Sequence, residues 1–333
     1  MRLSIIIVNY KTKDLLKDCL DSIKEDFKYE IIVIDNNSQD GSAEYINKFQ
    51  IPNSKLQTNS KLQIQNPKQD SSPEIRLITN KENLGFAKAV NQGLKIAQGE
   101  YILLLNPDTK IKQRDLSKCL GFLEKNSQIG ILGCQLVNSD NSLQGSFGNF
   151  PSLMTEFFQA TFLCKFFPFG RWIPFGFLSK RLFNKFHFVD WVGGGFMLFR
   201  KEVLDKIGGL DEKFFMYFED VDFCKRAKQA GWKIIYWPEV KILHHHMQSA
   251  KKDLALAWWQ EAESLIYYFK KYQKNLFLLK LLLYLRVYIQ IFIVSFFFIL
   301  LRIFKLKALS LSGNKKELLL SYKKFLEKLR KVN

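Results

Sequence analysis

The sequence predicts an α/β protein, with a doubly wound sheet followed by an apolar and basic C-terminal segment. In the first third of the chain, runs of β-branched residues alternate with segments of helical spacing, as strand–helix–strand units do. Each buried run also ends in polar residues, where the strands of such a sheet open into a crevice. A long apolar stretch among Lys and Arg near the end of the chain indicates a separate C-terminal part.

Four continuous apolar runs are typical of strands that are buried on both faces of a parallel sheet. We expect strands at Ser4–Tyr10, Glu30–Asp35, Ile75–Thr79 and Tyr101–Leu105. Apolar residues with a period of 3.6 lie between these runs and predict the connecting helices. We expect these helices at Lys13–Lys24, Ser42–Phe49 and Ala87–Ala97. Functional side chains are therefore expected at the carboxyl ends of the strands.

Two segments depart from this alternation. Residues 50–75 contain the string NSKLQ twice and few large apolar side chains, so we interpret them as a flexible surface insertion, with a lid as the alternative. Residues 147–191 are rich in Phe and Trp, with Pro, Gly and basic residues between them. This composition fits a helical subdomain that packs on the sheet, and it equally fits an acceptor-side or membrane-facing surface.

The cysteines indicate a reducing, cytoplasmic compartment. The chain has five of them, an odd number, and they are scattered without any CxxC pair. This pattern argues against both a disulfide framework and a zinc site. The N-terminal string MRLSIIIVNYK has too short an apolar run for a signal peptide and is interpreted as a strand.

The positive charge is concentrated in the C-terminal tail. Residues 270–333 hold 15 Lys and Arg against 2 Glu, which gives +13 of the formal net charge of +18. These charges lie among Leu, Ile and Phe rather than among Gly and Ser, which favours an anionic membrane surface over nucleic acid as the partner. The most apolar stretch is Leu276–Phe304, whose uncharged core between Arg286 and Arg302 would be roughly 22 Å long as a helix.

That core is shorter than a hydrocarbon layer of roughly 30 Å. We therefore expect the stretch to lie in the membrane surface or dip into it, with both ends on the cytoplasmic side. A tilted span and a helix buried in the protein's own core remain the alternatives. The surface interpretation also rests on polar residues that share a little over a third of the helical circumference. These residues are Lys280, Arg286, Gln290, Arg302 and Lys305.

Polar clusters follow the predicted strands. Val8-Asn9-Tyr10 ends the first strand, and a loop from Asp35 to Gly41, rich in Asn and Asp, ends the second. A carboxylate at the end of the second strand suits a ribose hydroxyl or a base edge, although the same residues also make ordinary turns. The next cluster is Asn83–Gly93, in which glycine at a helix entrance lets a ligand or a neighbouring backbone come close. A tight packing site is the alternative there.

Acidic residues and histidines form the remaining clusters. Asn106 and Asp108 follow the fourth strand, and a carboxylate beside a diphosphate can hold Mg²⁺ or Mn²⁺. Further along, three acidic residues lie within four positions after Gly193-Gly194-Gly195, where burial would be costly without a use. A solvated, acid-rich helix start is the alternative. Three consecutive histidines then follow, His244, His245 and His246, of which we expect one to bind metal.

Together and in this order, these clusters resemble the family 2 glycosyltransferases of GT-A fold, and among them the bacterial rhamnosyltransferase-like group. The resemblance covers roughly residues 2–270. The matching strings are SIIIVNYK, IIVIDNNSQDGS, NLGFAKAVNQG, LLLNPDT, GGLDEKFFMYFEDVDFCKRAKQAGW and YWPEVKILHHHMQS. The resemblance implies a GT-A nucleotide-diphospho-sugar transferase domain over residues 1–270, with residues 271–333 as a membrane-associated tail.

The resemblance also implies a role for each candidate residue. Asp220 would be the general base, with Glu219 and Asp222 supporting it on the acceptor side. Asp108 would be the chief ligand of Mg²⁺ or Mn²⁺, assisted by His244. Asn106 departs from the family's Asp-x-Asp pattern, which makes it a weaker ligand. The nucleotide-sugar-binding residues would be Val8, Asn9, Tyr10, Asp35, Asn37, Asp40, Asn83, Gly85, Phe86, Asn91 and Asn106.

The function implied is inverting, metal-dependent transfer of a sugar from a nucleotide-sugar donor. The favoured donor is dTDP-rhamnose, and the acceptor a lipid-linked glycan at the cytoplasmic face of the cell membrane, in cell-surface polysaccharide synthesis. A UDP-hexose or UDP-N-acetylhexosamine transferase is the alternative within the class. Other classes that share parts of this pattern are a sugar-1-phosphate nucleotidyltransferase and a non-catalytic sugar-binding protein.

Overall fold

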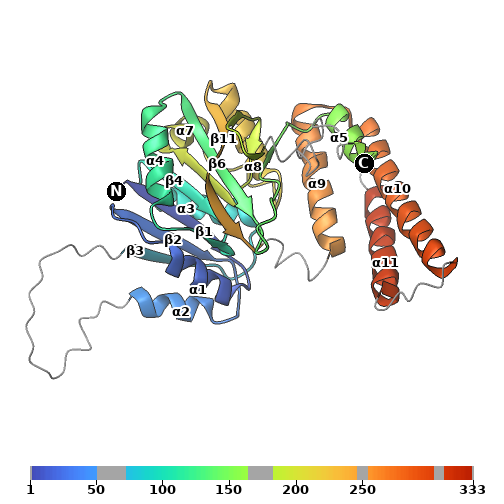
Figure 1. The fold of residues 1–333 in the computed structure, drawn as a ribbon, viewed down its shortest axis with the longest axis horizontal. Helices are drawn as coiled ribbons and strands as arrows, with labels where there is room; N and C mark the ends of the chain where they lie inside the picture. The colour runs from blue at the N-terminus through green and yellow to red at the C-terminus, as the bar shows by residue number, and fades with distance from the viewer. Residues whose placement is uncertain (1, 51–72, 164–182, 246–253, 304–310, 332–333) are drawn as a thin grey trace, which may run out of the picture.

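The computed structural model describes residues 2–50, 73–163, 183–245, 254–303 and 311–331. Figure 1 shows two parts side by side, an α/β part that contains the N-terminus and a group of helices formed by α5, α9, α10 and α11. The predicted insertion lies almost wholly outside the described residues, as do Cys164, His246 and much of the aromatic region 147–191.

The α/β part is built on a nine-stranded mixed sheet, and its first half is parallel. In this half the order is β3-β2-β1-β4, formed by Glu74–Thr79, Tyr29–Asp35, Leu3–Asn9 and Tyr101–Leu105. Every residue of β1, β2 and β4 is buried, whereas β3 is partly exposed at the sheet edge. The predicted fold class is confirmed, and all four predicted strands are present.

The second half of the sheet makes it mixed. Strand β10 (Phe196–Arg200) runs antiparallel to both β4 and β6 (Ile129–Val137), and β11 (Lys233–His244) runs parallel to β6. The short strand β5 (Thr109–Lys110) then pairs antiparallel with the end of β11. The remaining strand, β8 (His187–Phe188), also pairs with β11. Residues that follow β4 are thereby brought to the end of a strand more than a hundred positions later in the chain.

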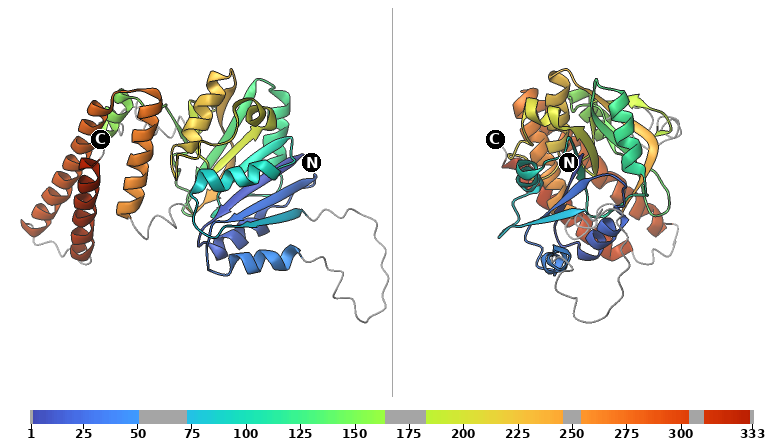
Figure 2. Two further views of the ribbon diagram at one scale, coloured as in Figure 1. Left: turned by 180° about the vertical axis from the view of Figure 1, so that it is seen from behind. Right: turned by 90° about the vertical axis from the view of Figure 1, so that its left-hand side faces the viewer.

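Helices cover both faces of the sheet, because alternate side chains of each strand point to opposite sides. Ile5 and Ile7 pack into one core and Ile6 and Val8 into the other. The first core holds α1 (Lys13–Ser22), α2 (Ser42–Gln50) and α4 (Asp115–Lys125). The second holds α3 (Phe86–Ile96), α7 (Lys201–Ile207) and α8 (Glu219–Gln229). Figure 2 shows this sandwich from behind and from the side.

The helical group consists of α5 (Leu153–Ala160), α9 (Leu254–Tyr272), α10 (Leu276–Ile303) and α11 (Leu311–Arg330). Trp258 of α9 stacks on Tyr322 of α11 with ring centroids 5.1 Å apart. Helix α9 also contacts the α/β part, where Tyr268 packs against Phe218. It therefore connects the two parts, and the boundary predicted at residue 270 falls inside it.

The described part of the aromatic region 147–191 divides between two environments. The strands β7 (Phe147–Gly148) and β9 (Trp191–Val192) pair with each other and are fully buried. Helix α5 instead packs against α10, and its Met154 side chain is 63 % exposed. One piece of the region thus belongs to the core as a pair of strands rather than as a helix, and the other belongs to the helical group.

Helix α10 turns an apolar stripe outward. Residues Leu276–Phe296 are long and apolar enough to cross a membrane, and only 17 % of this stretch is buried in the protein. This low burial disfavours the alternative of a core helix. The large exposed side chains recur at helical spacing, at Phe277, Leu281, Leu285, Tyr288, Phe292 and Phe296. Arg286 and Gln290, predicted to share a polar outer face, instead line a pocket between α9, α10 and α11.

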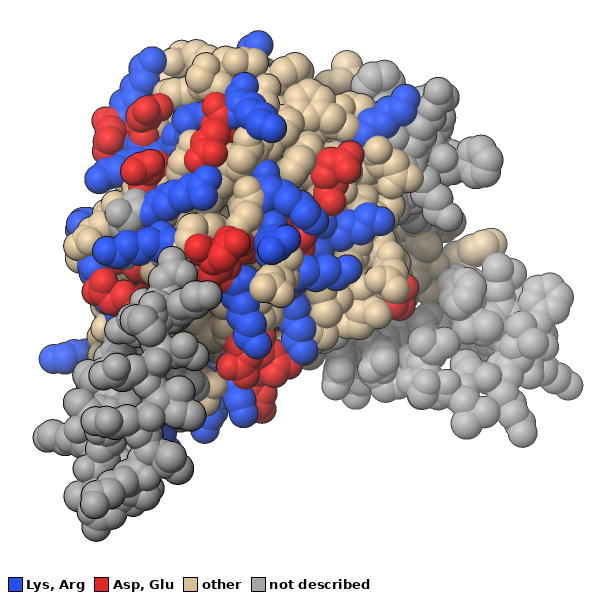
Figure 3. All heavy atoms as spheres, turned by 60° about the vertical axis from the view of Figure 1, so that its left-hand side comes forward, with Lys and Arg blue, Asp and Glu red and all other residues tan. Residues whose placement is uncertain are grey.

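Two further features bear on the environment of the protein. The described cysteines, Cys19, Cys119, Cys134 and Cys224, are all free and buried. On the face of the α/β part seen in Figure 3, Lys and Arg side chains are interspersed with Asp and Glu. Surface ion pairs such as Arg2–Glu124 and Lys110–Asp18 belong to this mixed pattern.

Candidate active site

The ends of β1 and β2 place Asn9 beside Asp35, because these two residues are paired in the parallel register. The Asn9 amide donates to Asp35 Oδ1 at 2.9 Å and to Ser38 Oγ at 2.8 Å. The Ser38 amide donates to the other carboxylate oxygen at 3.1 Å. Each oxygen of Asp35 keeps a further lone pair, so this carboxylate can still accept a hydrogen bond from a sugar hydroxyl.

Asp40 holds the same loop in place. It accepts hydrogen bonds from the backbone amides of Lys13 and Ser42, both at 3.0 Å, and so joins the starts of α1 and α2. Partial burial acts to raise the pKa of this carboxyl, but the bonds from Ser42 and Lys13 outweigh it and hold the pKa below its ordinary value. Between Asp35 and Asp40, Asn37 adopts a positive φ of 65°.

Asn36 organises the next loop and was not among the predicted site residues. It is 2 % exposed, and its amide donates to Asn83 Oδ1 at 2.8 Å and to the Gly85 carbonyl at 3.2 Å. Its Oδ1 accepts from the Leu84 amide at 3.1 Å. A signal was present in the sequence, since Asn36 directly follows the carboxylate that ends β2.

Gly85 lets this loop approach the segment before α8. Its φ is +84°, and a Cβ at this position would lie 2.6 Å from the Phe215 carbonyl oxygen. The Phe86 amide donates to that same oxygen at 2.7 Å. Asn91, predicted to bind the nucleotide sugar, lies further along α3. It exchanges two hydrogen bonds of 2.9 Å with the backbone of Leu210, so its side-chain amide serves the packing of α3.

Asp108, Asn106 and His244 come together although His244 lies more than a hundred positions later. The pairing of β5 with β11 sets His244 opposite Thr109, directly after Asp108. His244 Nε2 lies 3.1 Å from Asp108 Oδ1 and 3.2 Å from Asn106 Nδ2. Asp108 is 9 % exposed and His244 is 6 % exposed. Of the two described histidines of this run, His244 is thus the one whose ring contacts the predicted metal carboxylate.

The hydrogen bonds of Gln144 define which ring nitrogen of His244 faces the carboxylate. The Gln144 amide nitrogen donates to the His244 carbonyl at 2.7 Å and to Asn138 Oδ1 at 2.6 Å. Its Oε1 therefore faces His244 Nδ1, at 2.7 Å, and can only accept. Nδ1 consequently carries a hydrogen, and in the neutral ring Nε2 presents a lone pair toward Asp108 and Asn106. Such a fixed tautomer is typical of metal-binding histidines.

These residues fit a divalent cation. Two neighbouring ligand atoms of an octahedral ion, each at about 2.1 Å from it, lie about 3 Å apart, close to the 3.1 Å between His244 Nε2 and Asp108 Oδ1. In the described part of the chain no group of three or more His, Cys, Asp or Glu forms a cage. Water and substrate oxygens complete the shell of Mg²⁺ in such open sites. His245 points elsewhere, with Nδ1 3.1 Å from Ser139 Oγ.

Asp220 lies in the first turn of α8. Its Oδ2 accepts from the Gly194 amide at 3.0 Å and its Oδ1 from the Val221 amide at 2.8 Å. Burial raises the pKa of this carboxyl above its ordinary value, and the two amides oppose the rise only in part. Tyr217 and Phe218, directly before the helix, both have positive φ, 68° and 69°. Consecutive residues held in this unfavourable region are typical of functional sites.

The two other acidic residues of α8 have different environments. Glu219 is 6 % exposed, and its Oε2 has no hydrogen-bond partner in the described structure. Burial, together with the charge of Asp220, raises the pKa of Glu219 well above its ordinary value. Asp222 is fully buried and contacts Arg226 at 2.8 Å, Lys271 at 2.6 Å and the Tyr272 hydroxyl at 2.7 Å. Asp222 thus connects α8 with α9. It supports Asp220 only by fixing the position of α8.

The three-glycine turn Gly193–Gly195 separates Asp220 from the Asp108–His244 pair. A Cβ on Gly194 would lie 4.0 Å from Asp220 Oδ2 and 3.6 Å from the Phe86 ring. A Cβ on Gly195 would lie 3.5 Å from the His244 ring. The absence of side chains on this turn leaves open backbone between the carboxylate of α8 and the predicted metal ligands.

A mixed α/β sheet with this set of polar groups at its carboxyl edge has the architecture of the GT-A fold. Residues 4–208 match glycosyl transferase family 2, and the chain belongs to this family. Residues 179–249 also match a second family, described as the N-terminal domain of galactosyltransferase. The recognition made from the sequence motifs is confirmed.

Among relatives of known function, the chain is 31 % identical over 196 residues to N-acetylglucosaminyl-diphospho-decaprenol L-rhamnosyltransferase of Mycobacterium tuberculosis. It is 29 % identical over 172 residues to rhamnosyltransferase WbbL of Escherichia coli. These matches span 55 % and 51 % of this chain, and 62 % of each relative. The chain thus matches less than two thirds of the length of either enzyme.

Solved structures share the fold at low identity. Mannosyltransferase PcManGT from Pyrobaculum calidifontis, in complex with GDP-Man and Mn²⁺, superposes with a TM-score of 0.54 at 16 % identity, covering 98 % of this chain and 85 % of the other. GalNAc-T7 with UDP, GalNAc and Mn²⁺ superposes with a TM-score of 0.51 at 16 % identity, covering 73 % and 43 %. Both neighbours hold Mn²⁺.

Proposed function

We propose that this family 2 glycosyltransferase moves L-rhamnose from dTDP-rhamnose to a lipid-linked glycan, with inversion at the anomeric carbon. The observation that carries the proposal is the position of Asp220, a partly buried carboxylate oriented by the Gly194 amide at 3.0 Å. It lies across an open glycine turn from the Asp108–His244 pair. A base and a diphosphate-binding group on opposite sides of the Gly193–Gly195 turn suit direct displacement at a sugar carbon.

Asp220 acts as the general base in this proposal. The acceptor hydroxyl loses its proton to Asp220 while its oxygen attacks the anomeric carbon from the face opposite the departing diphosphate. The raised pKa of Asp220 strengthens it as a base at neutral pH, because a higher pKa increases its affinity for the proton. Glu219, buried beside it, would support Asp220 on the acceptor side.

Asp108 and His244 would hold Mg²⁺ or Mn²⁺. The chemistry that such an ion would supply there is neutralisation of the negative charge on the leaving diphosphate. Gln144 keeps His244 in the tautomer that presents Nε2. Asn106 contributes an amide beside the same nitrogen, at 3.2 Å, and is available for a ribose hydroxyl or a water.

The ends of β1 and β2 would bind the nucleoside. Asp35 keeps free lone pairs for a ribose hydroxyl or base edge, and Asn9 and Ser38 fix its orientation. Val8 and Tyr10 flank Asn9 at the end of β1, and Asn37 lies on the loop that Asp40 anchors. Asn83, Gly85 and Phe86 lie on the neighbouring loop, which Asn36 holds through its hydrogen bonds to Asn83 and Gly85.

Rhamnose as the donor sugar and a lipid-linked acceptor are supported by the two bacterial rhamnosyltransferases, one of which is named for a diphospho-decaprenol acceptor. The exposed apolar stripe of α10 supports a site of action at a membrane surface. Because nucleotide sugars are made in the cytoplasm, we place the catalytic part at the cytoplasmic face of that membrane.

A panel of nucleotide sugars tests the donor. Purified full-length protein with Mn²⁺ should show its largest rise in melting temperature with dTDP-rhamnose, because a bound donor stabilises the fold by mass action. Chelation of the metal should abolish the shift. A larger shift with UDP-glucose or UDP-N-acetylglucosamine would instead support the UDP-sugar alternative. The anomeric configuration of the transferred sugar, read by nuclear magnetic resonance, tests inversion independently.

A further inference from the structure

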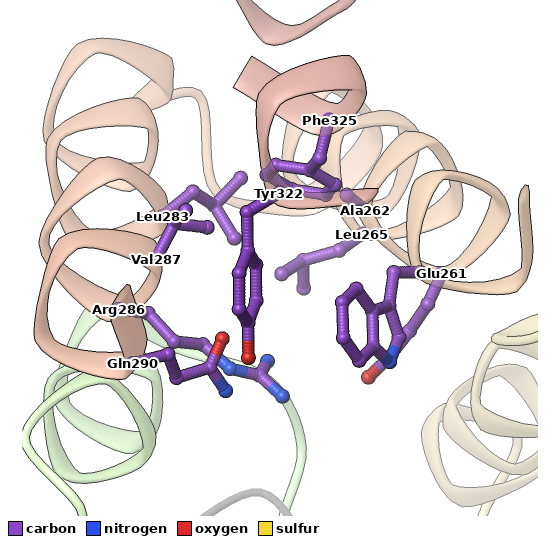
Figure 4. A pocket seen from close by; sticks show the side chains of 10 residues that line it. Glu261, Ala262, Leu265, Leu283, Arg286, Val287, Gln290, Tyr322 and Phe325 are labelled. Atoms are coloured by element: carbon purple, nitrogen blue, oxygen red, sulfur yellow. The ribbon is translucent and has the colours of Figure 1, made fainter. Parts of the chain in front are cut away.

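The helical group contains a pocket that is distinct from the crevice of the sheet. It lies between α9, α10 and α11, and Figure 4 shows the side chains that line it. Its apolar lining is well buried, with Leu265 at 1 % exposure and Leu283 and Val287 at 5 %. The pocket therefore offers an apolar interior on the inner side of the helix that carries the exposed apolar stripe.

One end of this pocket presents hydrogen-bond donors. Arg286 and Gln290 extend from α10 toward the hydroxyl of Tyr322 on α11, whereas Glu261 lies on α9 beyond that ring (Figure 4). Tyr322 is only 5 % exposed. Among the described residues, neither Arg286 nor Gln290 nor the Tyr322 hydroxyl has a hydrogen-bond or ion-pair partner. These polar groups border the pocket, Arg286 and Gln290 are only partly buried, and a ligand there can supply the acceptors that the protein does not.

These hydrogen-bond donors indicate the chemistry of the ligand that the pocket would bind. A phosphate offers several oxygen acceptors and a negative charge, which suits the planar guanidinium of Arg286 together with an amide and a hydroxyl. The adjoining apolar lining suits a hydrocarbon chain attached to that phosphate. The pocket is thus complementary to an anionic amphiphile.

Helix α9 connects this pocket with the active site. Glu261, Ala262 and Leu265 line the pocket. On another side of the same helix, Ser264 Oγ donates to the Met216 carbonyl at 2.8 Å, next to the segment that leads into α8. The pocket is therefore about one helix diameter, roughly 10 Å, from that segment. A ligand held there would be close enough to extend its glycosyl end toward Asp220.

We propose that the α9–α10–α11 pocket binds the isoprenoid phosphate end of the lipid-linked acceptor, with Arg286 as the phosphate-binding residue and Gln290 and Tyr322 as further donors. The inference rests on the proposed function for the identity of the ligand. The apolar stripe of α10 would give the lipid access to the pocket from the membrane. An anionic phospholipid of the membrane also carries a phosphate. Its binding would not explain why the pocket lies close to the active site, whereas binding of the acceptor would.

Binding to the full-length protein in detergent tests this inference without any transfer reaction. The probe is decaprenyl phosphate, titrated against the change in melting temperature, with decaprenol and phosphatidylglycerol as comparison ligands. We expect decaprenyl phosphate to bind at least tenfold more tightly than either. Arg286→Gln should weaken its binding about tenfold or more, because a hydrogen bond to a charged group is lost, and Arg286→Lys should restore part of the affinity.

The matched control is Lys324→Gln, which removes an exposed cation from α11 beside Phe325 and should leave binding unchanged. Unchanged affinity in folded Arg286→Gln, or equal binding of decaprenol, would overturn the inference. Equal binding of phosphatidylglycerol would overturn the assignment to the acceptor. Failure of the proposed function would be seen in a different experiment. The nucleotide-sugar panel would then show no preference for dTDP-rhamnose, while binding of decaprenyl phosphate would still depend on Arg286.

Discussion

Replacing Asp220 with asparagine distinguishes the catalytic role of this carboxylate from the structural role of its acidic neighbours. The side-chain amide introduced by Asp220→Asn would keep one oxygen that accepts from the Gly194 amide at 3.0 Å, whereas the 2.8 Å contact with the Val221 amide is lost. The substitution removes the ability to take a proton, which is worth roughly 10²–10⁴-fold in rate. We therefore expect kcat for transfer to fall by this factor while the affinity for the donor stays within about twofold of the wild type.

The same substitution should stabilise the fold at neutral pH. Because burial raises the pKa of Asp220 in the folded protein, ionisation of this group opposes folding above that pKa. Asp220→Asn removes this partly buried charge, whose desolvation outweighs the backbone hydrogen bonds to it, so the melting temperature of the variant should exceed that of the wild type at pH 7. The difference should disappear as the pH falls below the unfolded pKa of about 3.9, where aspartate is protonated in both states. The wild-type rate should likewise fall on acidification at a pH above this value.

Asp222→Asn is the matched control, two residues away on the same helix. Its carboxylate contacts Arg226, Lys271 and Tyr272 within 2.8 Å, so breaking this buried network should cost about 3 kcal/mol. That cost is at the low end for a buried pair, because Lys271 keeps Asp211 at 2.7 Å. The melting temperature should fall by several degrees, while kcat per folded molecule should change little.

Single-turnover measurements with a labelled donor, made on protein shown to be folded by circular dichroism, compare the two variants. A near wild-type rate for Asp220→Asn together with a loss of transfer in folded Asp222→Asn would refute the assignment of the base. A lower melting temperature for Asp220→Asn at pH 7 would refute the argument from burial.

Four further predictions concern the metal pair, the loop and the tail. Asp108→Ala should weaken Mn²⁺-dependent nucleotide affinity at least tenfold by calorimetry, since even outer-shell partners of a metal cost about 10–100-fold; unchanged affinity would contradict the metal assignment. His244→Ala should do the same, whereas His245→Ala, which removes a contact to an exposed serine, should have less than about a twofold effect. Gly85→Ala should lower the melting temperature, because a Cβ 2.6 Å from a backbone oxygen at positive φ costs about 1–3 kcal/mol, and an unaltered thermal scan would show that the loop relaxes freely. Phe292→Gln, at a side chain 68 % exposed on α10, should reduce binding to anionic vesicles about tenfold in a sedimentation assay, and full retention on the vesicles would argue against this face as the contact.

Much of the fold was predictable because its signals are local. A strand that is buried on both faces needs a continuous apolar run, and this pattern alone located β1, β2 and β4. The polar residues that end these strands marked the crevice. Order along the chain also placed Asn9 beside Asp35, since the first two strands of such a sheet are parallel neighbours.

Other features depended on contacts between distant segments, which no local period encodes. His244 meets Asp108 only because β11 pairs antiparallel with β5, and this pairing also turns His245 toward Ser139. Asn36 was missed because the four hydrogen bonds of its side chain reach residues 80–85, in the loop after β3.

Local patterns in the chain were enough to specify the sheet, the crevice and the acidic start of α8, because burial and helix periodicity act on neighbouring residues. Which acidic residue of α8 faces the site and which one packs against α9 depends instead on tertiary contacts. Asp220 and Asp222 are two positions apart, about 200° around a helix, so one faces Gly194 while the other faces α9. The orientation of α10 is likewise set by tertiary packing. Its contacts with α9 and α11 turn Arg286 and Gln290 inward and leave the apolar stripe outside, because the buried side of a helix depends on which partners cover it.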